Sequence, residues 1–443
     1  MQPCTTPVEN SAEGLLHASD TSAQPATIAA APPPTRRPLR ALHVIASVDP
    51  RSGGPIEAAF SGAEIWSRHG HVREIASLDP SSAPWVGAAR ARTFALGLDG
   101  GFYRKLTHWA PWLRYKYSPR LVPWLRVHAK EYDAVIVNGL WNYASLGSWR
   151  ALRRARTPYY VFTHGMLDPW FNKAYPLKTL FKKIFWRLFE HRVLRDAAGV
   201  FYTSEEERRL AQSSFAPYAA REHVVGYGAR DLSGDAQKQR ETFFAAIPMT
   251  RGRRFALFLS RIHEKKGIDI LIEAFAGLAA AYPDFDLVIA GPAQVGLQAS
   301  LMRLAETHGI GSRLHWVGML SGDVKYGALR AAEFFVLPSH QENFGVVVAE
   351  ALSCATPVLI TNKVNIWREV EADKAGMVVD DTIDGVARGL ARMLALGEAD
   401  HAAMRASARA CFAARYDLAK NALDLVELLE SENENFRLRH SRP

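Results

Sequence analysis

The chain alternates short apolar runs with longer segments of helical periodicity, and it does so in two separate series. In the first series, the apolar run at residues 42–47 is followed by a turn with Gly53 and Gly54, and then by a helical stretch over 55–69. A strand, a glycine turn and a helix form the opening unit of a doubly wound parallel sheet. This pattern predicts an α/β fold.

The same unit recurs along the chain. Ser204 follows the run AAGVFYT and has Glu207 three residues later, which predicts a capped helix start. A second series begins after a polar stretch at 230–252. Its predicted strands lie in RRFALFLS, FDLVIAGPA, RLHWVGML, AAEFFVLPS and ATPVLITN. Two successive arrays predict two Rossmann-like, doubly wound parallel-sheet domains that face each other across a cleft.

The length of 443 residues fits two domains of roughly 200 residues each. Residues 1–38 are rich in Ala, Pro, Ser and Thr, which predicts a disordered tail. The remaining predicted segments are an N-terminal domain over 39–229, a linker over 230–252, a C-terminal domain over 253–430 and a polar tail over 431–443.

The net charge of +9 suits an anionic partner, which could be a phosphate ligand, a nucleic acid or a membrane surface. Cys4, Cys354 and Cys411 show no metal-ligand spacing, and their odd number argues against a disulfide framework, so a reducing cytoplasm is the simpler interpretation. No uncharged apolar run reaches the length of about 18 residues that a membrane-spanning helix needs. The N-terminus lacks a basic start followed by an apolar stretch, so we expect no secretory signal.

The stretch HQENFGVVVAEALSCATPV, at 340–358, carries Glu342 and Glu350 within mostly apolar sequence. On a continuous strand the two carboxylates would lie ~27 Å apart, at ~3.4 Å per residue. If residues 343–345 instead form a loop and a helix begins near Val346, both carboxylates and the free helix amides face one ligand. The helix formers over 349–352 favour the second interpretation.

A pair of cations precedes another predicted helix. Arg261 follows the predicted strand that ends at Ser260, and Lys266 stands five residues later, before Gly267. The carboxyl end of a parallel strand is where such folds bind phosphates. Alone, the two cations would also fit a solvated surface, but together with the 340–358 stretch they indicate a phosphate site.

These segments resemble a known family. SRIHEKKGIDILIEAF, LVIAG, VGML and VLPSHQENFGVVVAEALSCATPVL are similar to the C-terminal half of glycosyltransferase family 4, and the resemblance covers about 40–430. Members of that family are retaining, nucleotide-sugar-dependent enzymes of the GT-B fold. The pair of glutamates with the upstream Arg and Lys is specific when the four occur together.

The resemblance implies a role for each matching residue. Arg261 and Lys266 would hold the diphosphate, Glu350 would bind the ribose, and Glu342 would contact the transferred sugar. The donor-binding residues would be Gly53, Gly54, Arg261, Lys266, Glu342, Asn343, Phe344, Gly345 and Glu350. The catalytic residues would be His164, Glu342, Arg261 and Lys266. His164, in THGM, matches a histidine near the reacting sugar.

We therefore expect a retaining glycosyltransferase that moves a sugar from a nucleotide-diphosphate donor to a lipid-linked or saccharide acceptor. The expected setting is cell-surface polysaccharide assembly at the inner face of the cytoplasmic membrane. No cofactor and no metal are expected. Asp284-Phe285-Asp286 imitates the metal motif of a different glycosyltransferase fold, but it precedes a strand and lies far from the phosphate loops.

Four other functions are alternatives to this interpretation. A nucleotide-sugar epimerase of the same fold stays open, whereas a phosphorylase is disfavoured because no lysine stands in a pyridoxal-binding context. A catalytically silent sugar-nucleotide-binding partner would not need His164, Arg261, Lys266, Glu342 and Glu350 together. A dehydrogenase is disfavoured because the first glycine pair has no third glycine and no acidic residue at the expected place.

Two basic segments suggest an anionic membrane surface. Residues 101–130 contain seven Lys or Arg, seven aromatic residues and no Asp or Glu, and residues 176–195 form an amphipathic helical pattern. Its apolar face consists of Leu177, Leu180, Phe181, Ile184 and Leu188, and its opposite face of Lys178, Lys182, Lys183 and Trp186. The alternative is a core helix with a solvated basic face. No nucleic-acid-binding module accompanies either segment, so we expect no nucleic acid.

Overall fold

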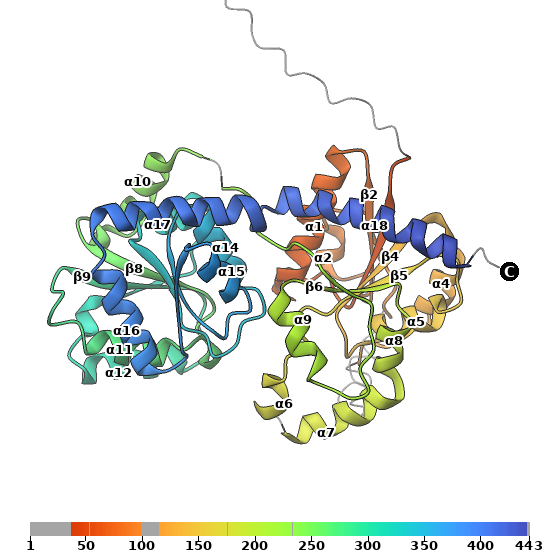
Figure 1. Cartoon of the computed structure of the whole chain (residues 1–443), viewed down its shortest axis with the longest axis horizontal. Helices are drawn as coiled ribbons and strands as arrows, with labels where there is room; N and C mark the ends of the chain where they lie inside the picture. The colour runs from red at the N-terminus through yellow and green to blue at the C-terminus, as the bar shows by residue number, and fades with distance from the viewer. Residues whose placement is uncertain (1–36, 53, 99–114, 175, 233, 441–443) are drawn as a thin grey trace, which may run out of the picture. The chain divides into compact units, whose positions relative to one another are not determined.

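A computed structural model describes residues 37–52, 54–98, 115–174, 176–232 and 234–440 (Figure 1). Nearly all of the predicted tail over 1–38 and half of the basic segment over 101–130 lie outside these ranges. Within them, no helix is both long and apolar enough to cross a membrane.

The first sheet has seven strands in the order β3-β2-β1-β4-β5-β6-β7, and all neighbours are parallel. Its strands are β1 (Arg40–Ile45), β2 (Val72–Ser77), β3 (Thr93–Ala95), β4 (Ala134–Asn138), β5 (Tyr159–Phe162), β6 (Gly199–Tyr202) and β7 (Glu222–Val224). The helices between them are α1 (Gly54–Arg68), α2 (Pro84–Gly87), α4 (Leu121–His128), α5 (Tyr143–Leu152), α6 (Trp170–Ala174), α7 (Pro176–Phe185), α8 (His191–Arg195) and α9 (Glu205–Gln212).

The second sheet has six parallel strands in the order β10-β9-β8-β11-β12-β13. Its strands are β8 (Arg254–Leu259), β9 (Phe285–Ala290), β10 (Leu314–Gly318), β11 (Phe334–Leu337), β12 (Val358–Thr361) and β13 (Gly376–Val379). The helices of this half are α10 (Ala236–Ala246), α11 (Ile268–Ala276), α12 (Leu297–Thr307), α13 (Gly322–Ala331), α14 (Val346–Ser353), α15 (Trp367–Ala372), α16 (Ile383–Leu394) and α17 (Glu398–Cys411).

Both sheets reverse their winding direction at one point, as a doubly wound fold requires. The reversal lies between β1 and β4 in the first sheet and between β8 and β11 in the second. Ligands of such sheets bind outside the carboxyl ends of the strands at this reversal. The prediction of two Rossmann-like parallel-sheet domains is confirmed, and the sequence segments with the candidate residues follow β8 and β11.

The segment predicted as a linker over 230–252 contains a helix, α10. Asp235 caps it by accepting from the backbone amides of Gln237 and Lys238. Phe243 of this helix is fully buried in the core of the second sheet and packs on Phe255. The polar composition suggested a linker because Phe243 and Phe244 are the large apolar residues of α10.

The last helix, α18 (Leu418–His440), runs across the predicted boundary between the second domain, which was to end at 430, and the polar tail, which was to begin at 431. It packs against α1 and shares a core cluster with residues of β1, β4 and β5, although the prediction placed its first part in the second domain (Figure 1). The indole nitrogen of Trp66 donates to the carbonyl of Ala422 at 2.8 Å. The supposed polar tail is helical to His440, and Asn433 is buried and accepts from the Tyr160 hydroxyl.

Candidate active site

The loop between β11 and α14 decides between the two interpretations of the segment that carries Glu342 and Glu350. The helix begins at Val346, as the second interpretation predicted, and Glu350 lies in its second turn. Gly345 has a φ of +73°, a conformation that costs a glycine little and other residues more. The Glu342 backbone forms two hydrogen bonds with one neighbouring segment, because its amide donates to Lys363 O and its carbonyl accepts from the amide of Asn365.

The structure brings Lys266 and Glu342 together. Lys266 ends a short 3-10 helix just before α11, and its ammonium group forms an ion pair with the Glu342 carboxylate. Gly267, the next residue, has a φ of +64°, and a Cβ there would stand 2.1 Å from the carbonyl oxygen of Pro338. The close passage of these two loops therefore requires glycine. Arg261, five residues before Lys266, is exposed at the end of β8.

Glu350 lines a cleft of about 310 Å³ to which residues of both domains contribute. Its Oε1 accepts from Lys325 of α13 at 2.7 Å. Its Oε2 is buried and has no hydrogen-bond partner among the described residues. A buried polar atom without a partner is rare in a folded protein, so this oxygen keeps an unused capacity to accept a hydrogen bond.

Gly54 brings the first domain to the same cleft. It is the first residue of α1, and a Cβ placed on it would lie 3.7 Å from Val346, the first residue of α14. The Tyr227 hydroxyl donates to the carbonyl of Gly54 at 3.1 Å, and its ring packs edge-on against Phe344. Gly53, the other predicted glycine, lies outside the described residues.

His164 stands in the tight turn after β5 with a φ of +49°. The turn is held by Glu207, whose Oε1 accepts from the Thr163 hydroxyl and from the Gly165 amide, both at 2.6 Å. Ser204 caps α9 by accepting from the Glu207 amide, as predicted. The Glu207 carboxylate, however, reaches Thr203 and this turn instead of closing a capping box.

Asn138, at the end of β4, links two histidines. Its Oδ1 lies 3.2 Å from His164 Nε2, and its Nδ2 lies 3.1 Å from His43 Nδ1. With the amide oxygen as acceptor, His164 carries its proton on Nε2 and keeps Nδ1 unprotonated. Burial lowers the pKa of His164 from 6.5 to about 4. Burial, aided by the charges of Arg73 and His164, also holds the pKa of His43 well below its ordinary value.

These neutral histidines predict acid sensitivity. Between pH 6.5 and about 4 the unfolded chain binds protons that folded His164 does not, so stability falls as the pH is lowered through this window. At about pH 5, the titration of His164 alone should lower the free energy of unfolding by about 2 kcal/mol relative to its value at neutral pH. Urea unfolding at the two pH values measures this difference. His43→Gln/His164→Gln should flatten the dependence and exposed His308→Asn should not, and equal slopes in all three proteins would contradict the assignment.

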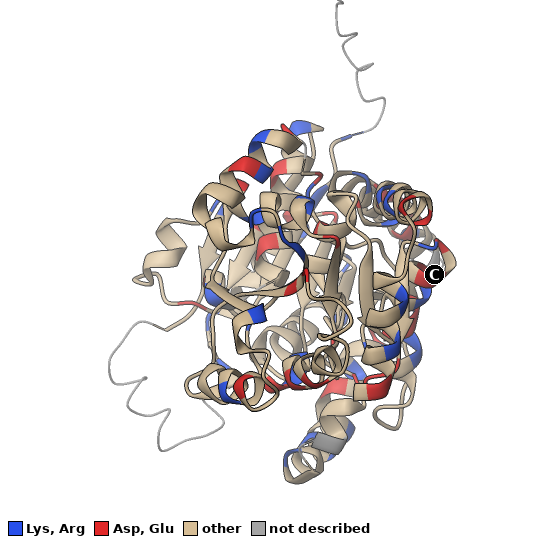
Figure 2. Ribbon diagram, turned by 90° about the vertical axis from the view of Figure 1, so that its left-hand side faces the viewer, with Lys and Arg blue, Asp and Glu red and all other residues tan. Residues whose placement is uncertain are grey.

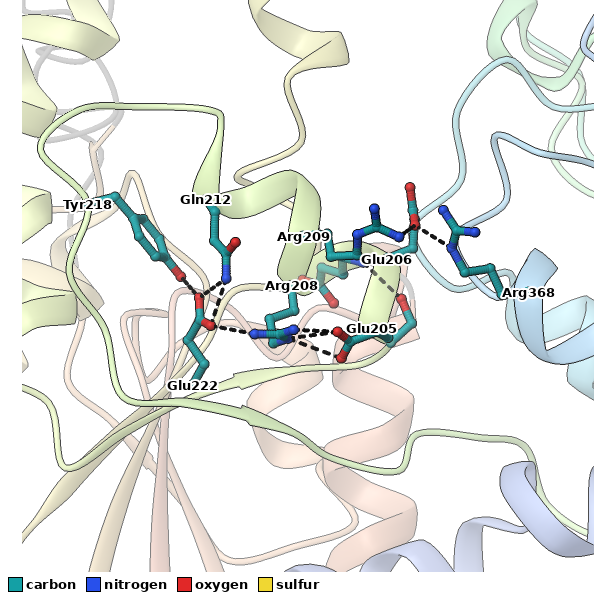
Figure 3. Close-up of polar contacts among 10 residues, drawn as sticks. Glu205, Glu206, Arg208, Arg209, Gln212, Tyr218, Glu222 and Arg368 are labelled. Atoms are coloured by element: carbon teal, nitrogen blue, oxygen red, sulfur yellow. Dashed lines mark hydrogen bonds and ion pairs between the residues drawn. The ribbon is translucent and has the colours of Figure 1, made fainter.

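The two halves of the chain also meet through direct polar contacts. The Asn343 amide group donates to the Thr203 hydroxyl at 3.2 Å, and that of Gln341 donates to Asp168 at 2.9 Å. Figure 3 shows Glu206 of α9 close to Arg209 of the same helix and bonded to Arg368 of α15. Asn343, in the predicted sugar-binding loop, and Gln341, next to Glu342, are thus bonded to side chains of the first domain.

The Asp284-Phe285-Asp286 motif serves packing in this structure. Burial would raise the pKa of Asp286, but hydrogen bonds from Arg253, His315 and Arg313 outweigh it and lower the pKa to about 2. Asp284 lies 3.4 Å from Arg254. In the part of the chain that the structure describes, no group of three His, Cys, Asp or Glu side chains is placed to hold a metal ion.

Sequence reasoning missed three residues around this site. Asn138 could have been found, because a polar side chain at the carboxyl end of a parallel strand lies where such sheets bind ligands. Glu207 was noticed only as part of a cap. Lys325 stands in a helix without any motif, so only the folded chain reveals that it pairs with Glu350.

Comparison with protein families identifies the chain's relatives. A model described as a glycosyl transferase 4-like domain matches residues 53–228, and one described as glycosyl transferases group 1 matches residues 239–411. The chain belongs to the family-4 type of glycosyltransferases. Both halves match, and both sheets have the topology expected for this family's GT-B fold.

The curated relatives share a low sequence identity with this chain over part of its length. The chain is 27% identical over 252 residues to a D-inositol 3-phosphate glycosyltransferase of Corynebacterium urealyticum, a match covering 55% of this chain and 59% of that one. It is 33% identical over 173 residues to the enzyme of the same name from Mycolicibacterium gilvum, a match covering 38% of each. The matches therefore span only about two fifths to three fifths of these relatives.

Solved structures share the fold of the family-4 type. A glycosyltransferase from Rickettsia africae has a TM-score of 0.68 at 14% identity, covering 90% of this chain and 100% of that one. HepE from Anabaena, solved in complex with UDP and glucose, has a TM-score of 0.64 at 18% identity, covering 89% of this chain and 100% of that one. At these identities the likeness establishes the fold alone.

Proposed function

We propose that the chain is a retaining glycosyltransferase that moves a sugar from a nucleotide-diphosphate donor to a lipid-linked or saccharide acceptor, at the inner face of the cytoplasmic membrane. Cell-surface polysaccharide assembly is the setting that fits such an acceptor. The single observation that carries the proposal is the meeting of Lys266, Glu342 and the start of α14 at the winding reversal of the second sheet.

The donor diphosphate fits this place for electrostatic reasons. Lys266 and Arg261 supply two positive charges, and the free amides at the start of α14 add a partial positive charge. Negative charge builds up on the departing diphosphate in the transition state, and preorganised cations stabilise it. A donor phosphate would then compete with Glu342 for Lys266 and free that carboxylate for the sugar.

The ribose fits Glu350, because this carboxylate has one oxygen paired with Lys325 and one buried oxygen without a partner. A ribose hydroxyl donating to Oε2 would satisfy that oxygen. The match to HepE, solved with UDP, supports a nucleotide as the donor's leaving group.

We name no protein nucleophile in this proposal. Glu342 and Glu350 each form an ion pair with a lysine, which stabilises the carboxylate and makes it a poorer nucleophile. The leaving phosphate takes the acceptor's proton, and the acceptor attacks on the face that the phosphate leaves. His164, neutral and bonded to Asn138, would act as a hydrogen-bonding group near the reacting sugar.

A donor panel tests the proposal. The purified protein is incubated with UDP-, GDP- and ADP-sugars, and release of the nucleoside diphosphate is measured together with the anomeric configuration of the sugar product. We expect slow hydrolysis of one donor class, with retained configuration. Tight binding of a donor without release of nucleoside diphosphate would contradict the proposal and indicate a silent binding protein. Recovery of the donor with an inverted ring carbon in its sugar would indicate an epimerase.

A further inference from the structure

The helix α7 exposes a row of large apolar side chains. Leu177, Leu180, Phe181 and Ile184 are exposed by 80%, 59%, 74% and 53%. Leu188 and Phe189, in the π-helical turn that follows, continue the row at 50% and 36%. We call these six residues the apolar stripe. They are six of the fifteen large hydrophobic residues that are exposed in the described part of the chain, gathered within thirteen positions.

The opposite side of this segment attaches it to the first domain. Trp186 is 1% exposed, and its indole nitrogen donates to Pro217 O at 2.8 Å. Thr179 is buried and donates to Asn172 O at 3.2 Å, and Phe185 packs against Tyr115. The sequence placed Trp186 on the basic face and left open whether the apolar face joined the core. The first point is corrected, because Trp186 is a core residue, and the second is decided, because the apolar face is the one left exposed.

The charged residues within the segment that carries the apolar stripe are all positive. Lys178, Lys182, Lys183 and Arg187 occur between its residues in the sequence, and no Asp or Glu occurs from 176 to 189. Figure 2 colours Lys and Arg blue and Asp and Glu red on the whole ribbon. Glu190, the first carboxylate, is fully buried, where it accepts from the Ser145 hydroxyl and the Trp141 amide. Lys182 lies 4.9 Å from the centre of the Trp141 ring, so it also helps to hold the helix.

This combination selects one occupant. Contiguous exposed apolar surface on a soluble protein marks an interaction site. A second copy of the chain would bring the same cations opposite these, and like charges across an interface are unfavourable. A helix with an apolar face bordered by Lys and Arg instead lies in an anionic lipid surface, with its apolar face about 5–10 Å into the headgroup and acyl boundary.

The apolar stripe is also close in the chain to the candidate site. α6, which immediately precedes α7, carries Trp170 and Phe171, and their ring centres lie 5.0 and 4.8 Å from the ammonium group of Lys265. Lys265 is the neighbour of Lys266. Asp168, two residues before Trp170, accepts from Gln341 beside Glu342. A membrane that contacts α7 is therefore near the loops that would hold the donor.

We propose that the apolar stripe inserts into an anionic membrane surface and so presents the candidate site to an acceptor carried on a lipid. Insertion itself needs no catalysis, whereas the choice of a lipid-linked acceptor rests on the proposed function. The segment over 101–130 was expected to make this contact. Of its described residues, Lys116 bonds to Ala46 O and lies 3.7 Å from Asp79, and Trp124 packs on Phe94, so these two serve the fold.

Flotation with vesicles tests the insertion. The full chain should float with vesicles of phosphatidylglycerol and phosphatidylcholine and float much less with phosphatidylcholine alone. High salt should weaken this binding without removing it, because salt screens charges but not apolar insertion. Leu180→Ser/Phe181→Ser/Ile184→Ser should lower the partition at least tenfold. The matched variant Met249→Ser/Val295→Ser/Met302→Ser, at exposed apolar positions elsewhere, should bind as the unmodified protein does.

A charge variant separates the two contributions. Lys183→Ser/Arg187→Ser should remove the preference for phosphatidylglycerol while leaving the fold intact, since both side chains are exposed. The proposal is overturned if the unmodified protein stays soluble with anionic vesicles at low salt, or if the triple stripe variant floats as well as the unmodified protein. It is also overturned if sedimentation shows a dimer that only the stripe variant loses, since the stripe would then join two copies.

Hydrolysis of a soluble donor, measured on the same variants, keeps this inference distinct from the proposed function. We expect equal hydrolysis by the unmodified protein and the stripe variant, because the stripe does not touch the donor site. If no donor is hydrolysed while flotation still depends on the stripe, the glycosyltransferase proposal fails and the membrane surface stands.

Discussion

Lys266→Ala should lower the turnover of the nucleotide-sugar donor by about two to three powers of ten while leaving the protein folded. The side chain is 12% exposed, ends the loop before α11 and pairs with Glu342. Loss of one preorganised group that faces developing negative charge typically costs about 2–4 kcal/mol of transition-state stabilisation. Steady-state release of nucleoside diphosphate measures this change.

Arg261→Ala should have an effect of similar size, because Arg261 stands just after the carboxyl end of β8 and is assigned to the same diphosphate. Exposed Lys238→Ala on α10 is the matched control and should turn over donor as the unmodified protein does. The thermal midpoint of each variant shows whether the fold has survived. Full turnover by purified, folded Lys266→Ala and Arg261→Ala would remove these residues from the site.

The two glutamates should respond differently to substitution. Glu350→Ala should raise the donor KM roughly tenfold to a hundredfold with little change in kcat. A ribose contact is present in the ground state and the transition state alike, and hydrogen bonds to charged groups contribute about 1.5–3 kcal/mol. Glu342→Ala should mainly lower kcat, because Glu342 is assigned to the sugar that moves.

Lys325→Ala provides a further check on Glu350. It removes the partner of Oε1 and should raise the donor KM in the same direction as Glu350→Ala, without lowering kcat as Glu342→Ala does. The opposite ordering, with kcat lowered by Glu350→Ala and KM raised by Glu342→Ala, would mean that the roles of the two carboxylates are exchanged. No change in either constant would place both outside the donor site.

Local sequence determined the order of the strands and helices. The apolar runs identified in the sequence became β1, β6 and the five strands β8 to β12, since such runs form buried parallel strands between helices. The cap at Ser204 and the helix start at Val346 were also predictable, because both depend on residues within one helical turn. The pairing of Lys266 with Glu342 joins segments that the family resemblance had already placed in one site.

Long-range contacts decided the rest. The sequence of α10 is that of a polar linker, and only the burial of Phe243 shows that it belongs to the core of the second sheet. The position of α18 in the sequence suggests the second domain, but Trp66 and Tyr160 of the first domain form hydrogen bonds with it. Lys325 and Asn138 gained their roles from residues 25 and 26 positions away. The amphipathic pattern of α7 showed that one face would be apolar, but periodicity is the same for a helix that packs on a core and one that faces a membrane. Only the burial of Trp186 on the other side showed which face the fold leaves free.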